Sequence, residues 1–457
     1  MLITRAGTLN WPGKTRRNNR RSPRALCAIG VLLLFAALMM PPTAGAADEY
    51  SFDPSETDKK PYSFGGYAEA KPILFALDRD AALYKTRFYD RNVSNPLSEY
   101  DFTLQLDAGI EWNIFKAFAR INNSLDRTYD GWSDDSKPYE LFLSAKPSPS
   151  LTAAAGKMTA KWGKGYAWNP VAFVDRPKDS DDPTLNLEGF YMAGFDYIRS
   201  FEGPLKTFSF SPILLPVDHG LNHDFGESGH LNYAAKAYFL LWDTDIDLMF
   251  LTGNSRPDRF GFDFSRNITT NLEIHGESAW IEDFRQNKID DAGRVSQTEM
   301  DTWSGLLGLR YLTSSETTYI LEYYHNGTGY SHSEAKDFYA FVDRAYSTYV
   351  DTGNAGPIQK AANLTQGSYG RSNPMQDYLY IRVSQKEPFD ILYFTPAVTT
   401  ILNLDDRSFS LSPELLYTGI TNLELRLKGT VLVGDRFTEY AEKPNDARLE
   451  LRIRYYF

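Results

Sequence analysis

The chain of 457 residues contains a single cysteine, Cys27, and no C-x-x-C-H motif. One thiol excludes an internal disulfide framework and a thiolate metal site, and the missing motif excludes covalently attached haem. Beyond residue 40 there is no run of 18 apolar residues, which excludes a membrane-spanning helix there. The chain also lacks an excess of basic residues, so a nucleic-acid partner is disfavoured. What it has in abundance is aromatic residues, with 29 Phe and 29 Tyr.

The first 46 residues have the features of a secretory signal peptide. Seven basic residues precede or border the apolar run "ALCAIGVLLLFAALMM" at 25–40, which is shorter than the roughly 20 residues that a spanning helix needs. Ala44 and Ala46 fit the small-x-small rule, so cleavage is predicted after Ala46. Cleavage would remove seven of the 48 basic residues and none of the 59 acidic ones, leaving a net charge of −18.

The C-terminal stretch "ARLELRIRYYF", residues 447–457, alternates strictly between two kinds of side chain. The residues at odd positions are apolar and end on aromatics, and those at even positions are mostly charged. Such a period of two predicts a β-strand with one wet and one apolar face. The stretch "YDFTLQLDAGIEW" at 100–112 shows the same pattern, with aromatics at both ends of the apolar face. Aromatic ends are typical of strands whose outer face crosses a bilayer.

The pattern recurs along the whole remaining chain and predicts an all-β fold, a transmembrane antiparallel β-barrel of about 18 strands. Counts of 16 or 20 stay open. Short periplasmic turns alternate with long outer loops, which are expected at 78–99, 126–138, 159–187, 215–230, 281–298, 325–376 and 434–445. A soluble sandwich or propeller would also have period two. However, the chain lacks a repeat of blade length, and its charged alternate positions require one wet face.

The chain is therefore predicted to consist of a signal peptide (1–46), a short N-terminal periplasmic segment (47–61) and an outer-membrane barrel (62–457). We predict the outer membrane of a Gram-negative bacterium as the location, with its lipid as a partner. The terminal aromatics Tyr455 and Phe457 resemble the signal by which the barrel assembly machinery recognises its substrates, which adds that machinery as a second partner.

Charges of opposite sign are expected on opposite sides of the lumen. A basic wall on the last two strands would consist of Arg426, Lys428, Arg448, Arg452 and Arg454. An acidic wall on the ninth to eleventh strands would consist of Asp245, Asp247, Asp263, Glu273 and Glu277. The two walls would create a transverse field that orients polar solutes. Alternatively, the charges serve only for solvation of the walls and mutual pairing.

The connection from Gly156 to Phe190 is rich in cations and aromatics, and its glycines and prolines favour a compact loop. We expect it to fold into the lumen and form a constriction that presents cations to an anionic group and aromatic rings to a sugar or ring. The residues of this constriction are Lys157, Lys161, Trp162, Lys164, Tyr166, Trp168, Asp175, Arg176 and Lys178. The alternative is a loop that covers the outer mouth and touches no solute.

No pattern in the sequence indicates catalysis or metal binding. His275 between Glu273 and Glu277 has no nucleophile that can be paired with it, so the protein is not expected to be an enzyme. The stretch "PVDHGLNHDFGESGH" at 216–230 contains three histidines without a recognised ligand spacing. Neither a cofactor nor a metal site is predicted.

Four segments, "RLELRIRYYF", "KWGKGYAWNP", "EYYHNGTGYS" and "TNLELRLKGT", resemble the alginate-export group of outer-membrane porins and related porin-like barrels. The resemblance covers roughly residues 60–457 in scattered short stretches. It implies an 18-strand monomeric channel with an in-folded, charged constriction. The residues that correspond most closely in chemical type to the basic pore of that group are Lys157, Lys161, Lys164 and Arg176. The acidic wall departs from a uniformly basic conduit.

The function predicted from these features is a porin for passive, charge-selective passage of small polar or anionic solutes, saccharides among them. The alternative is the barrel sheath of a porin–cytochrome electron conduit, whose partner would be a multihaem cytochrome. An in-folded loop favours the pore, because a sheath requires an open lumen.

Overall fold

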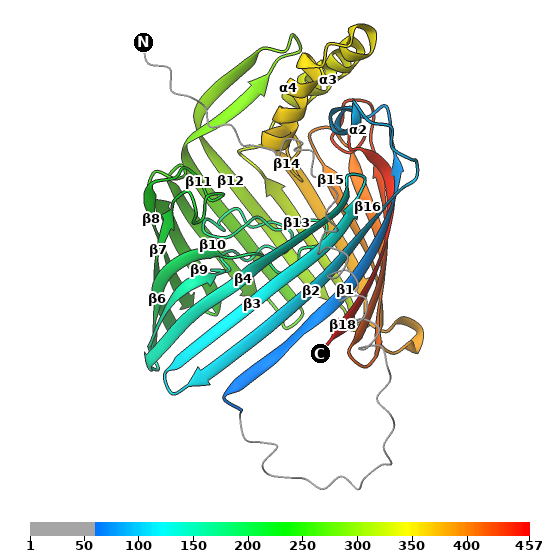
Figure 1. Ribbon diagram of the computed structural model, residues 1–457. Coiled ribbons are helices and arrows are strands. Elements are labelled where there is room, and N and C mark those ends of the chain that lie inside the picture. Colours follow the sequence, from blue (N-terminus) through cyan, green and yellow to red (C-terminus); the bar gives the residue numbers. More distant parts are fainter. Residues whose placement is uncertain (1–59) are drawn as a thin grey trace, which may run out of the picture. The chain divides into compact units, whose positions relative to one another are not determined.

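The computed structural model describes residues 60–457 and shows a closed antiparallel barrel of 18 strands (Figure 1). The predicted signal peptide and the predicted periplasmic segment, except its last two residues, lie outside the described residues. Closure occurs where β1 (Tyr62–Leu77) pairs with both β2 (Leu97–Trp112) and β18 (Asn445–Tyr456). The predicted fold class and strand count are therefore confirmed.

Each strand pairs with its neighbours in sequence, so the barrel is a simple meander without crossovers. Closure leaves no unpaired sheet edge, which is what a bilayer demands of a β-structure. The other strands are β3 (Phe115–Thr128), β4 (Gly131–Ser148), β5 (Leu151–Met158), β6 (Phe190–Ser200), β7 (Leu205–Val217), β8 (His230–Leu241), β9 (Thr244–Thr252), β10 (Arg259–Asn267), β11 (Leu272–Ile289), β12 (Val295–Leu312), β13 (Thr317–His325), β14 (Asp377–Gln385), β15 (Phe394–Asn403), β16 (Phe409–Ile420) and β17 (Leu423–Val433).

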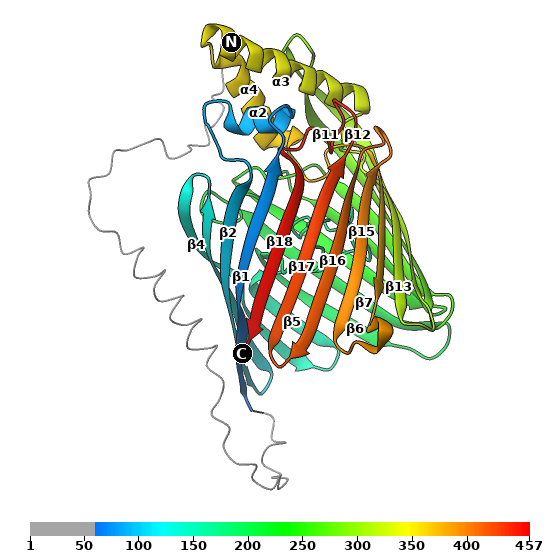
Figure 2. The same cartoon turned by 90° about the vertical axis from the view of Figure 1, so that its right-hand side faces the viewer.

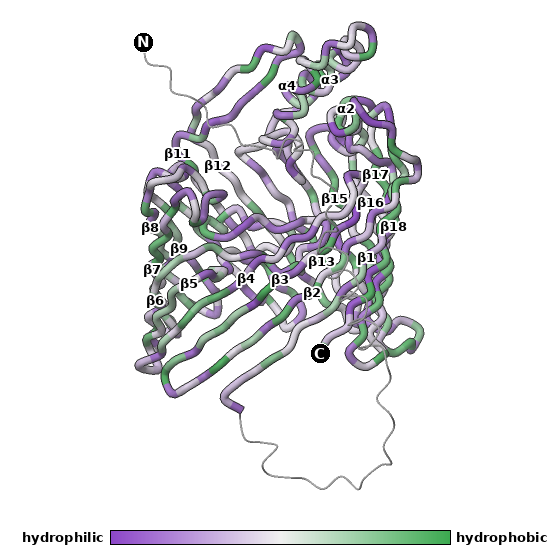
Figure 3. Tube along the Cα trace, in the orientation of Figure 1, coloured by the Kyte–Doolittle hydropathy of each residue, from purple (hydrophilic) through white to green (hydrophobic). Residues whose placement is uncertain are grey.

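The outward face of the barrel is an apolar band. On β2 the apolar parity ends in Ile110 and Trp112, which are largely exposed, and along the strands apolar and polar residues alternate (Figure 3). Such a face suits hydrocarbon. We call the end with the short turns the periplasmic end and the other the outer end, following the usual orientation of such barrels. Of the helices within residues 60–457, none has the length and apolarity needed to span a bilayer.

Two of the expected outer loops are not loops. β3 and β4 meet at a tight turn at 129–130, and β11 and β12 continue as a paired hairpin up to Ile289 and Val295. These extensions rise beyond the apolar band, where neither face needs to suit lipid, and one face of the β11–β12 extension packs against the helical cap through the buried Ile289. They consequently lack the apolar parity that marks a strand in the sequence, which is why 126–138 and 281–298 were wrongly assigned to loops.

Helices occupy the outer end, in two further segments that were expected to be loops (Figure 2). They are α2 (Ala82–Phe88), α3 (His332–Thr352) and α4 (Gly356–Leu364), followed by the π-helical turn η2 (Thr365–Tyr369). α3 begins with a capping box, in which the Ser331 side chain accepts a hydrogen bond from the Glu334 amide, and ends at Gly353 with a φ of 74°.

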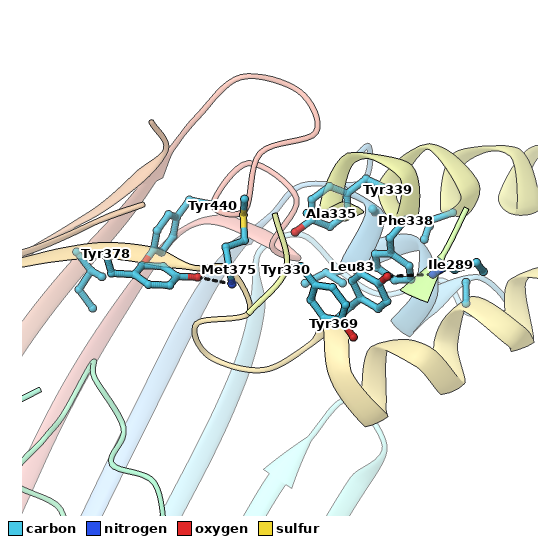
Figure 4. Close-up of a cluster of buried hydrophobic side chains, with 14 of the residues drawn as sticks. Leu83, Ile289, Tyr330, Ala335, Phe338, Tyr339, Tyr369, Met375, Tyr378 and Tyr440 are labelled. Carbon is cyan, nitrogen blue, oxygen red and sulfur yellow. Dashed lines mark hydrogen bonds between the residues drawn. The ribbon is translucent and has the colours of Figure 1, made fainter. Parts of the chain in front are cut away.

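The helices share one aromatic core (Figure 4). Tyr369 is stacked between Tyr330 and Phe338, with ring centroids 4.0 and 4.1 Å apart. The Tyr369 hydroxyl also accepts a hydrogen bond from the Ile289 amide at the tip of β11, at 3.2 Å. The same buried cluster extends down to Trp168, in the connection between β5 and β6. The helical cap and that connection therefore pack as one unit.

Candidate functional site: the lumen loop

The connection between β5 and β6, residues 159–189, lies inside the barrel and contacts widely separated strands of its wall. We call it the lumen loop. Its first half hydrogen-bonds to β11, where Gly165 N lies 2.6 Å from Glu277 Oε1. Its second half reaches β18, where Arg452 Nη2 lies 2.6 Å from Asp182 Oδ2. β11 and β18 are seven strands apart in the ring, so the loop crosses the lumen.

Two wall carboxylates hold the first half of the loop by its backbone. Glu277 accepts hydrogen bonds from the amides of Lys164 and Gly165, both at 2.6 Å. Glu322 on β13 accepts from the amides of Tyr166 and Ala167. These oxygens satisfy amide groups that no strand or helix pairs, so they fix the path of the loop.

Close approach to the wall requires glycine at two positions. Gly163 has a φ of 94°, and a Cβ there would lie 2.8 Å from Glu277 Oε1. A Cβ on Gly165 would lie 2.1 Å from the carbonyl oxygen of Trp168 in the same loop and 2.9 Å from Leu306 Cδ1 of the wall. Any side chain at either position would push the loop away from the wall.

A lysine of the loop enters the acidic wall. The Lys164 ammonium lies 2.8 Å from Asp247 Oδ2 and 3.9 Å from Asp263 Oδ1, and these two aspartates face each other on β9 and β10. Burial alone would lower the pKa of Lys164, but the hydrogen bond to Asp247 and the charges of both aspartates raise it. These contacts favour the protonated form of Lys164, whose charge offsets part of the negative charge of the wall.

Arginines of the basic wall hold the second half of the loop. Asp182 accepts from Arg452 at 2.6 Å and from Arg426 at 2.9 Å. Beside it, the Asp181 side chain accepts from Arg448 and its carbonyl from Lys428. Burial alone would raise the pKa of Asp182, but the guanidiniums of Arg452 and Arg426 outweigh it and hold the pKa below its usual range.

The depressed pKa of Asp182 makes its contribution to stability pH-dependent. Because the folded-state pKa lies below the unfolded one, the contribution is complete above the unfolded value of about 4 and is lost as the pH falls further. We expect the difference in free energy of unfolding between wild type and Asp182→Asn to be constant from pH 8 to pH 5 and to shrink below about pH 4. Denaturant unfolding in vesicles at each pH measures it. A difference that shrinks between pH 8 and 5 would contradict this ion pairing.

The remaining charged residues of the two walls also have partners, an ion pair for Arg454 and hydroxyl groups for Asp245 and Glu273. Arg454 pairs with Glu69 of β1 at 2.6 Å. Asp245 accepts from the Tyr238 hydroxyl at 2.5 Å, and Glu273 accepts from the Ser265 hydroxyl at 3.2 Å. These contacts fit the interpretation that the wall charges pair with other groups of the protein, and not the interpretation of a transverse field. Most of the partners belong to the lumen loop. The basic and acidic walls do not face each other across open water.

Several of the residues expected at the constriction hold the loop together. Lys157 pairs with Glu188, and Arg176 pairs with Asp224 at 2.5 Å. The Lys178 ammonium donates to the Gly165 carbonyl at 2.7 Å, and its burial lowers its pKa. Asp175 accepts from the Ala160 amide at 2.7 Å and from the Trp162 amide at 3.0 Å, and its burial raises its pKa. These contacts are structural, although all the residues lie in the predicted segment.

The aromatic residues of the loop differ from the expectation that they present rings to a solute. Trp162 is 3% exposed and Trp168 is 7% exposed. Trp168 stacks on Tyr324 of β13, with centroids 5.1 Å apart, and Tyr166 packs against Tyr380 of β14. The rings anchor the loop to the wall and to the helical cap, because apolar surface next to a water-filled lumen is buried where it can be.

A cavity of about 280 Å³ remains between the loop and the opposite wall of β3 and β4. From the wall it is lined by Arg120 and Glu140, and from the loop by Thr159, Lys161, Asn169 and Asn186. Arg120 is held between Asp107 at 2.8 Å and Glu140 at 2.9 Å. These wall residues were not predicted, although Arg120 is one of the polar residues that alternate with apolar ones along β3.

Lys161 differs from the other cations of the loop. It is exposed, its φ of 56° turns the backbone into the left-handed region, and it lines the cavity. Within residues 60–457, it alone of Lys157, Lys161, Lys164, Arg176 and Lys178 has neither an ion-pair partner nor a side-chain hydrogen bond. Its ammonium is therefore free to meet a solute. In the described part of the chain, no cluster of three or more His, Cys, Asp or Glu residues is placed to hold a metal ion.

Comparisons with known proteins agree with this architecture. Neither a family model nor a curated protein matches the sequence. Among solved structures, OccAB1 of Acinetobacter baumannii is similar with a TM-score of 0.52 and 9% identity, over 87% of this chain and 97% of that chain. A BenF-like porin from Pseudomonas fluorescens Pf-5 is similar with a TM-score of 0.50 and 12% identity, over 87% of this chain and 99% of that chain. The chain therefore has the fold of the bacterial outer-membrane porins.

Proposed function

We propose that the protein is an outer-membrane channel for the passive passage of small polar or anionic solutes, saccharides among them. The observation that supports this is the cavity beside the lumen loop, which is lined by charged and amide side chains on both sides. Solutes would pass between the loop and the wall of β3 and β4, since most of the other contacts of the loop with the wall are to β9–β11, β13, β17 and β18. A lumen crossed by a bonded loop favours a pore over a cytochrome sheath, which needs an open lumen.

The charges around the cavity favour anions. Lys161 has a free ammonium, while both carboxylates that line the cavity, Glu140 and Asp175, are already hydrogen-bonded within the protein. An unpaired cation in a narrow passage attracts anions and repels cations. The resemblance to alginate-export porins, which have a basic pore, agrees with this preference for anions. However, Lys157, Lys164 and Arg176 are engaged in ion pairs, so we propose small solutes.

We also propose roles for the two ends of the chain in export and assembly. Residues 1–46 would direct export and be removed, and 47–61 would lie in the periplasm before the first strand. Tyr455 and Phe457 would be read by the assembly machinery. Their place at the end of the closing strand supports this, since Phe457 and Gly66 of β1 exchange two backbone hydrogen bonds at 3.2 Å.

Reversing the charge at Lys161 should change ion selectivity. We expect Lys161→Glu to lower the permeability ratio of chloride to potassium at least about threefold, because the only free ammonium of the loop becomes a carboxylate. Reversal potentials of the refolded protein in planar bilayers under a KCl gradient measure the ratio. The matched control is Lys336→Glu on α3, the same exposed charge change outside the barrel. Equal ratios in wild type and Lys161→Glu would remove this residue from the conduction path.

A further inference from the structure

The turn between β14 and β15, residues 386–393, differs from the other periplasmic turns. It contains the short helix η3 (Pro388–Asp390) and projects outward from the barrel wall as an orange segment in Figures 1 and 2. Four large apolar side chains are exposed within five residues: Phe389 by 93%, Ile391 by 49%, Leu392 by 63% and Tyr393 by 56%. The turn beside it, "TSSE" at 313–316, is polar.

The backbone of this turn is unusual for residues that carry a Cβ. Glu387, Phe389, Asp390 and Tyr393 have φ values of 49°, 58°, 59° and 62°. The left-handed region is unfavourable for such residues and persists only where the surroundings impose it. A tight turn of this length would not need four such residues. The four residues with positive φ fold the turn so that its apolar side chains remain exposed on the outside of the barrel.

Several backbone groups of the turn are hydrogen-bonded within the protein. The Glu387 amide donates to the Phe394 carbonyl at 2.8 Å, and the Tyr393 amide donates to the Glu387 carboxylate at 2.9 Å. The Thr418 amide, near the periplasmic end of β16, donates to the Tyr393 carbonyl at 3.0 Å. Irregular backbone that contacts lipid needs internal partners of this kind, because an unpaired polar group there is costly.

The exposed surface of the turn is continuous with the face of the barrel that contacts lipid. Val398 of β15 and Tyr417 of β16 lie on that outward face, 45% and 37% exposed, and Tyr417 pairs with Phe394 at the end of the turn. We propose that the β14–β15 turn is a membrane anchor, which inserts Phe389, Ile391 and Leu392 among the glycerophospholipids of the periplasmic leaflet. Tyr393, with an apolar ring and a polar hydroxyl, suits the boundary between acyl chains and headgroups. This anchor does not depend on conduction.

Site-directed fluorescence tests the anchor. In a Cys27→Ser background the chain has no other cysteine, so Phe389→Cys can be labelled with an environment-sensitive fluorophore. Leu392→Cys is the second variant, in case the first does not fold, and Ser315→Cys in the neighbouring polar turn is the control. Each protein is reconstituted in vesicles of phosphatidylethanolamine and phosphatidylglycerol. Quenching is then measured with aqueous iodide and with phospholipids that carry a nitroxide high on the acyl chain.

Insertion predicts blue-shifted emission at position 389 or 392, strong quenching by nitroxide lipid, and quenching by iodide at least about threefold weaker than at position 315. Iodide quenching equal to that of the control would overturn the proposal, because the turn would then lie in water. A blue shift without nitroxide quenching would also overturn it, because protein would then cover the turn.

Discussion

Replacing the lumen loop with a two-residue turn is expected to raise single-channel conductance by about threefold or more, because the loop is the main obstacle within an 18-strand lumen. The replacement is geometrically possible, since Met158 and Phe190, which flank the loop, pair directly across β5 and β6. An Asn-Gly turn can join such a pair. Without the loop, the aspartates at 247 and 263 and the arginines at 426 and 452 would face water. The transverse field inferred from the sequence would then exist in the variant.

Conductance of the refolded variant in planar bilayers measures this effect, and a heat-modifiable shift in electrophoretic mobility shows that the barrel has formed. Lys336→Glu on the helical cap is the control that leaves the lumen unchanged. A variant with a formed barrel and wild-type conductance would contradict the placement of residues 159–189 in the conduction path.

Changing Asp182 to alanine is expected to destabilise the protein by about 3 kcal/mol, because Arg426 and Arg452 would lose their shared partner while they remain buried. This value is at the lower end of the free-energy loss expected when one partner of a buried ion pair is removed, because both arginines keep other carboxylates nearby. Arg426 retains Glu414 at 2.5 Å, and Arg452 retains Glu450 and Glu69 at 3.5 and 3.6 Å. Equilibrium unfolding in guanidinium in the presence of vesicles measures the change in free energy.

Asp179→Ala is the matched control for this prediction. It removes an exposed carboxylate three residues away in the same loop. Among the described residues, this carboxylate has no ion-pair partner and accepts one hydrogen bond, from the Asp181 amide at 3.0 Å. Its effect should stay within about 1 kcal/mol, the size of one exposed hydrogen bond. Protease cleavage between residues 159 and 189 should increase in Asp182→Ala and not in the control. Equal stabilities of the two variants would show that the basic wall does not hold the loop.

Most of the barrel could be predicted from the sequence because a bilayer imposes a simple rule on each strand. Every strand needs apolar residues at alternate positions, and short and long connections must alternate. The start of the barrel is also confirmed, because β1 begins at Tyr62, the first residue of the predicted barrel segment. The rule ends where the strands leave the membrane, so the extensions near Asp134 and Arg285 were missed.

The site could be predicted only in part. The composition of the β5–β6 connection indicated a compact loop, but not which of its charges would be paired. Lys161 and Lys164 have the same residue type, yet Lys164 lies between two wall aspartates and Lys161 faces the cavity. That difference depends on strands more than 80 residues away in the sequence. The burial of Trp168 likewise depends on β13 and the helical cap.

Cysteine accessibility at Lys161 tests most directly whether the cavity beside the lumen loop is the route of passage. In the Cys27→Ser background, Lys161→Cys channels in a planar bilayer are exposed to charged methanethiosulfonate reagents, with Lys336→Cys as the control. We expect a stepwise fall in current when either a cationic or an anionic reagent reacts at position 161, with opposite changes in ion selectivity and no change at position 336. A current that does not change although mass spectrometry shows complete modification at position 161 would contradict it.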